Sequence, residues 1–577
     1  MRNPKLAGVN RRDFNRLVAG AGASAALAPR GAGIASAAAP ARLSAQGVER
    51  GDNIGVNEAF KAMAFGTASG AGWTRYTVQW FNVQPQPGPL NEHYFRDNQG
   101  RSILEAQVNA GVKVAAMVLG TPEWAAAVPG LKTGTSVPRG LYTDAMVGDQ
   151  PNPENPWAVF MFNLAKSYAG LMDVFEIWNE VEIPTGGSNA VYNTWAGSAA
   201  DYYRLLAVAS EAVKAVNPFA KIVTSPYSYF KDQQEGEGQR LPWFDDFMAA
   251  VRAGGAHVFD AVALNLYRNP HDLWDRMWGG MGGVWAGANI PPNRRAGEPL
   301  LDQKADLQGF RARLDAAGAQ GKELWITELN AMPYDDPVPG WNTGSQNDGF
   351  RITMAEQSSY VLQAYGTALA AGWNKVFFQA LQDDPYPVPD ELWGLVRFNS
   401  DSNNNDPSRA RPAYGAFQLA ASALGNADNV DLHIRVRADN PRDRYRQYAS
   451  RYKWGAHAVV ADKGAQRSYI LWNGSETDQP VTIQAWGAEA TLYVPDGAGN
   501  YQPQAISPSG NQYNITLPRA TRHFELFGGD PPNYFYVGGP TYLLVEQGVP
   551  GGAGVSLSNF TKKDRRPDTQ TDPDARD

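Results

Sequence analysis

The chain of 577 residues contains no cysteine. Disulfides, thiolate metal ligands, cysteine nucleophiles and a lipidated cysteine are therefore all excluded. Histidine is also scarce, with six in the whole chain and none in the H-E-x-x-H spacing of a zinc site. From the sequence we expect neither a metal nor a cofactor.

A strongly basic surface and long apolar runs are lacking as well. The net charge of -7 offers no basic face to a phosphate backbone, so nucleic acid is not an expected partner. After the N-terminal segment, no stretch reaches the roughly 18 consecutive apolar residues of a membrane-spanning helix. We therefore expect a mature protein without stable membrane insertion.

The first residues have the features of a targeting segment. Arg11 and Arg12 are followed by Phe14, a weakly apolar Ala/Gly-rich stretch and small residues suited to cleavage near 35–39. This pattern resembles a twin-arginine export signal. We expect residues 1–39 to be a signal peptide that the twin-arginine translocase binds during export. The mature protein would then reach the periplasm, the cell envelope or the extracellular space.

A length of 577 residues predicts more than one folded unit, because single cores stop growing near roughly 250–300 residues. Between about 50 and 422, short apolar runs alternate with segments of helical periodicity, a pattern typical of βα units. Helices are expected at 157–169, 199–216, 307–317 and 354–371. Strands are expected at 73–80, 112–119, 174–178, 221–225, 259–266, 323–328 and 375–379, with an opening strand at 53–56 or around Phe65. Eight such units predict an α/β fold, a (β/α)8 TIM barrel; a doubly wound open sheet is the alternative.

The sequence pattern changes after the expected barrel. Short β-rich segments at 457–461, 467–472, 480–485, 490–494 and 513–517 are separated by Gly, Asn, Asp and Pro turns. They predict a smaller all-β sandwich domain over residues 428–548. The last stretch, 550–577, is charged and poor in apolar residues, so we expect a disordered tail.

Two glutamates follow expected strands at the end where a barrel builds its active site. Glu180 comes directly after the strand at 174–178, and Glu328 ends the strand at 323–328. If these are the fourth and seventh strands, the two carboxyls face each other across the barrel mouth. A neutral carboxyl and an ionised one on either side of a sugar are the minimum equipment for glycoside hydrolysis.

The surrounding motifs carry a resemblance to a known group. EIWNE at the end of one strand and WITE at the end of another resemble the signatures of clan A glycoside hydrolases, the retaining (β/α)8 enzymes. Arg75 in WTRYTVQW, the segment VKVAAMVLGTPEWA, and WGLVRFN followed by RPAYGAF are similar to further parts of that pattern. With the trailing β-sandwich, the chain most resembles family thirty-nine, the β-xylosidases and α-iduronidases.

The resemblance implies roles for individual residues. It makes Glu180 the acid/base and Asn179 the partner of the sugar 2-hydroxyl. It makes Glu328 the nucleophile, with Arg75 keeping that carboxylate ionised. A carboxyl separation of about 5–5.5 Å and net retention of configuration follow from such a pair.

The chain departs from the pattern at two places. Val181 stands where many clan members have proline after the acid/base, and Asn265-Leu266-Tyr267 stands where many have His-x-Tyr. Tyr267 is still expected to bond the nucleophile. Aromatic residues in loops at the barrel mouth, Trp124 and Trp393 among them, suit stacking on sugar faces.

Two further glutamates flank the acid/base. We interpret Glu176 as structural and Glu182 as a solvated rim residue or a subsite contact.

These observations predict an exported retaining glycoside hydrolase that cleaves O-glycosidic bonds in β-linked plant or microbial oligo- or polysaccharides. A transglycosylase using the same glutamates and a catalytically inactive carbohydrate-binding protein remain alternatives. A serine hydrolase is disfavoured, because no G-x-S-x-G motif is present. The sequence does not indicate the sugar, exo or endo action, or the oligomeric state.

Overall fold

The structure is a computed structural model. It describes residues 49–183, 194–228, 242–267, 270, 272–278, 309–338, 351–384, 392–402, 404–436, 454–475, 477–520 and 537–565. The predicted signal peptide, residues 1–39, lies outside the described residues. No helix within these ranges combines the length and the apolarity needed to cross a membrane.

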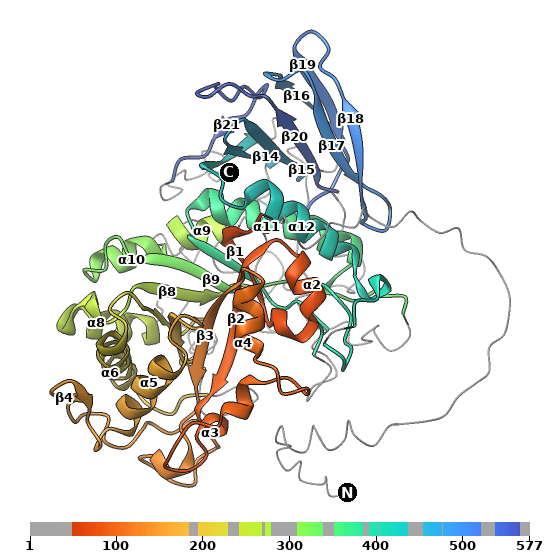
Figure 1. The fold of residues 1–577 in the computed structure, drawn as a ribbon. Coiled ribbons are helices and arrows are strands. Elements are labelled where there is room, and N and C mark those ends of the chain that lie inside the picture. Colours follow the sequence, from red (N-terminus) through yellow and green to blue (C-terminus); the bar gives the residue numbers. More distant parts are fainter. Residues whose placement is uncertain are drawn as a thin grey trace, which may run out of the picture.

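Eight parallel strands close into a barrel in the order β1-β12-β9-β8-β7-β6-β3-β2 (Figure 1). In chain order they are β1 Gly51–Asn57, β2 Ala71–Gln79, β3 Lys113–Leu119, β6 Val174–Ile177, β7 Lys221–Thr224, β8 Ala261–Asn265, β9 Glu323–Leu329 and β12 Lys375–Phe378. The predicted (β/α)8 fold is confirmed, and β6 and β9 are indeed the fourth and seventh barrel strands.

Helices of the βα units surround this barrel. They are α2 Met63–Ala68, α3 Trp80–Val83, α4 Ile103–Asn109, α5 Pro156–Ser167, α6 Ala199–Val216, α8 Pro242–Gly254, α9 Asp272–Trp278, α10 Phe310–Ala316, α11 Met354–Ala371 and α12 Pro412–Leu424. Local chemistry sets several helix ends. Capping boxes formed by Ser198 with Asp201 and by Thr353 with Glu356 start α6 and α11, and Gly372 ends α11 at a φ of 99°.

The barrel interior is apolar at the N-terminal end of the strands and polar at the other end. The apolar plug combines three large rings with small or branched side chains: Trp73, Ala115, Val174, Val223, Ala261, Ala263, Trp325 and Phe377. Gly55 leaves room for the Phe377 ring, since a Cβ there would lie 2.3 Å from it. Because strand side chains alternate, Arg75 and Glu176 lie one inward position beyond Trp73 and Val174.

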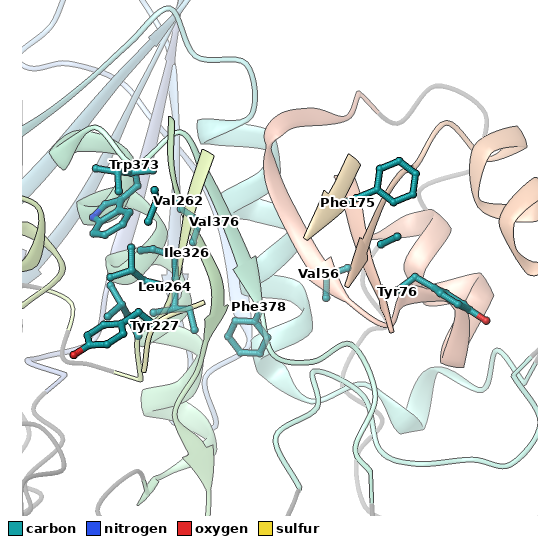
Figure 2. Packing of buried hydrophobic residues seen from close by; sticks show 14 of the residues in the cluster. Val56, Tyr76, Phe175, Tyr227, Val262, Leu264, Ile326, Trp373, Val376 and Phe378 are labelled. Atoms are coloured by element: carbon teal, nitrogen blue, oxygen red, sulfur yellow. The ribbon is translucent and has the colours of Figure 1, made fainter. Parts of the chain in front are cut away.

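Outward-facing strand residues pack beneath the helices. Figure 2 shows Val262, Leu264, Ile326 and Val376 gathered beside Tyr227 in this layer. Each of these five side chains is at most 3% exposed. Burial on both faces explains why the strands have nearly continuous apolar sequences.

One barrel strand carries a bulge that affects the site. The neighbouring residues Leu264 and Asn265 of β8 pair with Ile326 and Glu328, so β9 has one extra residue at Thr327. The pairing of β9 with β12 shifts at the same place. Strict alternation from the inward Trp325 would turn Glu328 away from the barrel mouth. The bulge re-aims Glu328 toward it.

The C-terminal region forms two packed antiparallel sheets, as predicted. The large sheet has the order β18-β17-β20-β15-β14-β13-β21, and the small one pairs β16 with β19. Their bounds are β13 Asn429–Val436, β14 Trp454–Lys463, β15 Gln466–Asn473, β16 Gln479–Gln484, β17 Ala490–Pro495, β18 Tyr501–Ile506, β19 Gln512–Leu517, β20 Tyr542–Gln547 and β21 Thr561–Lys562. Shorter strands are β4 Met146–Val147, β5 Gln150–Pro151, β10 Met332–Pro333 and β11 Arg351–Ile352.

The large sheet also packs on the barrel through α11, which lies between the two domains in Figure 1. Gly366 of α11 lets the helix approach, because a Cβ there would lie 3.1 Å from Val459 of β14. Gln363 of α11 donates a hydrogen bond of 2.8 Å to Thr541, which precedes β20. A helix with apolar partners on two sides reads as buried all round, and Glu356 to Ala371 are all buried.

The expectation of a disordered tail over 550–577 needs correction. The segment up to residue 565 lies on the structure: β21 pairs with β13, and the Arg565 Nε atom donates to the carbonyl of Ala370 at 2.9 Å. In addition, Leu557 is buried in the core of the sandwich and Lys562 pairs with Asp431 at 2.6 Å. These contacts are widely spaced along the segment, so they leave no periodic apolar pattern in the sequence. Residues 566–577 lie outside the described part.

Candidate active site

Arg75 forms the centre of a buried charge cluster at the polar end of the barrel. Its Nη1 atom donates to Glu328 Oε1 at 2.5 Å, and its Nη2 atom donates to Glu176 Oε1 at 2.5 Å. Nη2 also donates to Asn179 Oδ1 at 2.9 Å. One guanidinium from β2 therefore connects β9 with both β6 and the turn that follows it.

Glu176 lies at the base of this cluster and is 0% exposed. Burial raises the pKa of Glu176 to about 7, although the Arg75 guanidinium acts in the opposite direction. Its contacts with Arg75 agree with the structural interpretation of this residue. Glu176 thus helps to fix the guanidinium that contacts Glu328.

Glu328 is held from two sides and remains 13% exposed at its side chain. The Tyr267 hydroxyl donates to Glu328 Oε2 at 2.6 Å, while Arg75 occupies Oε1. Tyr267 also packs against Trp393, with ring centroids 5.2 Å apart. Two donors, one of them cationic, hold the carboxylate in a fixed orientation.

The turn after β6 has an unusual backbone that separates neighbouring side chains. Trp178 and Glu180 have φ angles of 75° and 46°, in the left-handed region that non-glycine residues rarely adopt. The Trp178 side chain is fully buried, and its indole nitrogen donates to the carbonyl of Thr194 at 2.8 Å. Trp178 therefore packs in the core beside Trp195, rather than forming a wall of the cleft beside Glu180.

Glu180 has the environment of a carboxyl that keeps its proton. Burial raises the pKa of Glu180 well above its usual range, and the charges of Glu328 and Glu182 act in the same direction. A hydrogen bond from Asn265 Nδ2 to Glu180 Oε1, at 2.8 Å, opposes this shift. Burial and the neighbouring carboxylates therefore favour the protonated form of Glu180.

The structure brings six of the predicted site residues together. Hydrogen bonds connect Arg75, Asn179, Tyr267 and Glu328. Trp393 packs on Tyr267, and Glu180 interacts electrostatically with Glu328. Trp124 is different. Its indole nitrogen donates to the carbonyl of Gln84 at 3.0 Å and its ring packs on Trp80, so its predicted contact with sugar stays a prediction.

Sequence reasoning missed the part that Asn265 plays. Thr327 Oγ1 donates to Asn265 Oδ1 at 3.1 Å, which directs the amide nitrogen of Asn265 at Glu180. The available signal was position, since Asn265 ends the sixth barrel strand two residues before Tyr267.

The expectation for Glu182 as a solvated rim residue is wrong. Its side chain is 1% exposed, and Ser228 donates both its backbone N–H and its hydroxyl to Glu182 Oε1. The left-handed turn at Glu180 carries the next residues inward, which alternation in sequence does not reveal.

Groups of acidic or histidine side chains that could hold a metal ion are not found in the described ranges. No protein-family model and no curated protein matches this sequence.

Solved structures do match the fold. A family 39 glycoside hydrolase from the gut symbiont Bacteroides cellulosilyticus WH2 is 16% identical, with a TM-score of 0.51 over 86% of this chain and 81% of that one. A monomeric beta-xylosidase from Caulobacter crescentus CB15 is 13% identical, with a TM-score of 0.47 over 87% of this chain and 97% of that one. The likeness to the family 39 structure shows that the two chains share a fold.

Proposed function

We propose that this chain is a retaining glycoside hydrolase that cleaves β-linked glycans by double displacement, with Glu328 as nucleophile and Glu180 as acid/base. One observation carries the proposal. Glu328 is bound by Arg75 and Tyr267, while burial and the Glu328 charge favour the protonated form of Glu180. Two carboxyls in opposite protonation states at one barrel mouth are what this chemistry requires.

In the first step, the Glu328 carboxylate attacks the anomeric carbon while Glu180 transfers its proton to the departing glycosidic oxygen. The bond to the leaving group breaks and a glycosyl ester forms on Glu328. Asn179 Oδ1 accepts from Arg75, so Asn179 would offer its Nδ2 group to the sugar 2-hydroxyl. Tyr267 and Arg75 keep the attacking carboxylate oriented.

The second step reverses the role of Glu180. Ester formation removes the negative charge of Glu328, one of the causes of the raised Glu180 pKa. Glu180, now ionised, takes a proton from water as the water attacks the anomeric carbon and releases Glu328. The sugar leaves with its original configuration, and Glu180 is protonated for the next cycle.

A panel of aryl glycosides, including β-xylosides, β-glucosides and α-iduronides, tests the activity. The panel is run with the wild type and with Glu328→Ala, each with and without azide. We expect the wild type to release phenol, and azide to restore turnover in Glu328→Ala as a glycosyl azide of inverted configuration. Glu180→Ala is the matched variant, for which azide should give a product of retained configuration.

Other outcomes separate the alternatives. Glycan binding without turnover of any substrate would favour the inactive carbohydrate-binding protein. Transfer of the sugar to an added acceptor in preference to water would favour the transglycosylase. Activity that survives in Glu328→Ala without azide would contradict the proposed nucleophile.

We also propose that the protein is exported by the twin-arginine route to the periplasm, cell envelope or exterior. The support is Arg11-Arg12, the following Phe14 and the weakly apolar stretch behind them. The absence of cysteine is compatible with an oxidising compartment, because folding there then needs no disulfide.

A further inference from the structure

Glu182 is a third carboxylate next to the proposed active site, and the mechanism above does not use it. It lies two residues beyond Glu180 and is 1% exposed. Its Oε1 atom accepts the Ser228 backbone N–H and the Ser228 hydroxyl, both at 2.5 Å. Ser228 lies four residues beyond β7, so this contact joins the segments that follow the fourth and fifth barrel strands.

The contact continues to the sixth barrel strand and returns to Glu180. Tyr227, next to Ser228, donates its N–H to the carbonyl of Ala263 at 3.2 Å, and Asn265 donates its N–H to the carbonyl of Tyr227 at 3.3 Å. The Asn265 side chain then donates to Glu180. A closed ring of contacts therefore runs from Glu180 along its own turn to Glu182, across to the segment after β7, and back to Glu180 through the end of β8.

Glu182 borders a space that helices α6 and α8 also line. With Tyr202 of α6 and Trp243, Phe244 and Phe247 of α8, it lines a small cavity between the barrel and the helices. Substrate at the barrel mouth would not contact it. Its influence on the reaction must pass through the turn that it holds or through its charge.

Several charged and titratable groups act on Glu180. Glu328 from β9 and Glu182 from its own turn raise the Glu180 pKa, and Arg75 from β2 lowers it. Tyr202 of α6 is a titratable neighbour of Glu182. Glu182 is thus the one group in this set that is fastened to Ser228 while it interacts with Glu180.

We propose that Glu182 is a positioning residue that fixes the Glu180 carboxyl by fastening the turn after β6 to Ser228. This inference rests on the proposed function, since it assigns Glu180 the role of acid/base. The backbone of that turn is strained, so it needs such a contact to hold its conformation. Left-handed φ angles at Trp178 and Glu180 persist only where surrounding contacts hold them.

Substitutions separate the hydrogen bonds of Glu182 from its charge. Glu182→Gln keeps an oxygen that accepts from Ser228 but loses the charge. Glu182→Ala loses both, and Ser228→Ala keeps the charge and the backbone N–H while losing the hydroxyl. Glu211→Gln, on the exposed surface of α6, is the matched control.

The rates are measured with two aryl glycosides, one with a poor leaving group and one with an activated dinitrophenyl group. Misplacement of the acid in Glu182→Ala should lower kcat/KM, which reports the glycosylation step, about 10- to 100-fold for the poor leaving group. The activated substrate needs less protonation in that step, so its kcat/KM should fall much less. Glu182→Gln should restore most of the lost kcat/KM, and its alkaline limb should move to lower pH.

Equal loss of kcat/KM on both substrates in Glu182→Ala would overturn the proposal, because a general loss of folded enzyme affects both alike. An unchanged rate and pH profile in all three variants would also overturn it. If the wild type hydrolyses no glycoside, the proposed function fails separately. The Glu180 titration, followed by carbon NMR with Glu180→Gln for assignment, then decides: an unchanged titration in Glu182→Gln and Glu182→Ala overturns the inference.

Discussion

Replacing Arg75 by methionine should expose the energetic cost of the buried charge cluster. The substitution removes the contacts of one guanidinium with Glu176, Glu328 and Asn179. Glu176 is 0% exposed and the Glu328 side chain 13%, so neither carboxylate is well solvated after the cation is lost. Removing one partner of a buried ion pair costs about 3–5 kcal/mol of unfolding free energy. We expect a loss in that range.

The pH dependence of this loss has a definite sign. The pKa of Glu176 in the folded protein is about 7, raised by burial from an ordinary value of 4.5. A raised pKa stabilises the folded state at low pH, and this stabilisation is lost as the pH rises toward about 7. Without Arg75 the pKa of Glu176 rises further. The Arg75→Met variant should therefore lose less unfolding free energy below about pH 6 than above about pH 8.

A second substitution makes the test sharper. Glu176→Gln should destabilise the wild type, because it removes a carboxylate that Arg75 binds. In the Arg75→Met background the same change should stabilise, because it removes a buried carboxyl that, without its cation, must take up a proton to fold near neutral pH. Urea unfolding of the four proteins measures the cycle. An Arg75→Met loss under about 1 kcal/mol, or the same sign for Glu176→Gln in both backgrounds, would refute the reasoning.

Three further predictions follow from the site and the N-terminal motif. Tyr267→Phe keeps the aromatic ring but removes a hydrogen bond to a charged group worth about 1.5–3 kcal/mol, so kcat/KM should fall about 10- to 150-fold; a loss under about twofold would contradict the contact with Glu328. Because the pKa of Glu180 is raised, activity should persist above the usual range of a carboxyl and fall as pH rises through that pKa, and Glu180→Gln should abolish this limb while impairing poor leaving groups most; a limb that survives in the variant belongs to another group. Changing Arg11 and Arg12 to lysines should leave the full-length protein in the cytoplasm, as fractionation and immunoblotting would detect; unchanged export would count against the twin-arginine route.

The barrel was predictable from sequence because its strands are buried on both faces. Segments such as 112–119 and 323–328 are short and apolar and lie at regular intervals, which is the pattern of a parallel sheet. The strand ends then placed Glu180 and Glu328 at one mouth. Arg75 was accessible to the same reasoning, since inward positions recur every second residue from Trp73.

Other features depend on backbone geometry that side-chain patterns do not encode. The extra residue at Thr327 re-aims Glu328, and the left-handed turn buries Glu182 where a rim residue was expected. In the second domain, β18 is exposed over most of its length and contains a proline, so alternation does not reveal it. β21 is two exposed residues long and is placed by pairing with β13 and by the contact of Lys562 with Asp431.

The central claim is that Glu328 forms a covalent bond with the sugar, and trapping measures this directly. The protein is incubated with a 2-deoxy-2-fluoro glycoside of the sugar that the aryl glycoside panel identifies, which slows release of the intermediate. Peptides are then analysed by mass spectrometry. The account predicts one added fluoroglycosyl group, located on Glu328. An adduct on Glu180 or elsewhere, or an active enzyme that forms no adduct and inverts its product, would contradict it.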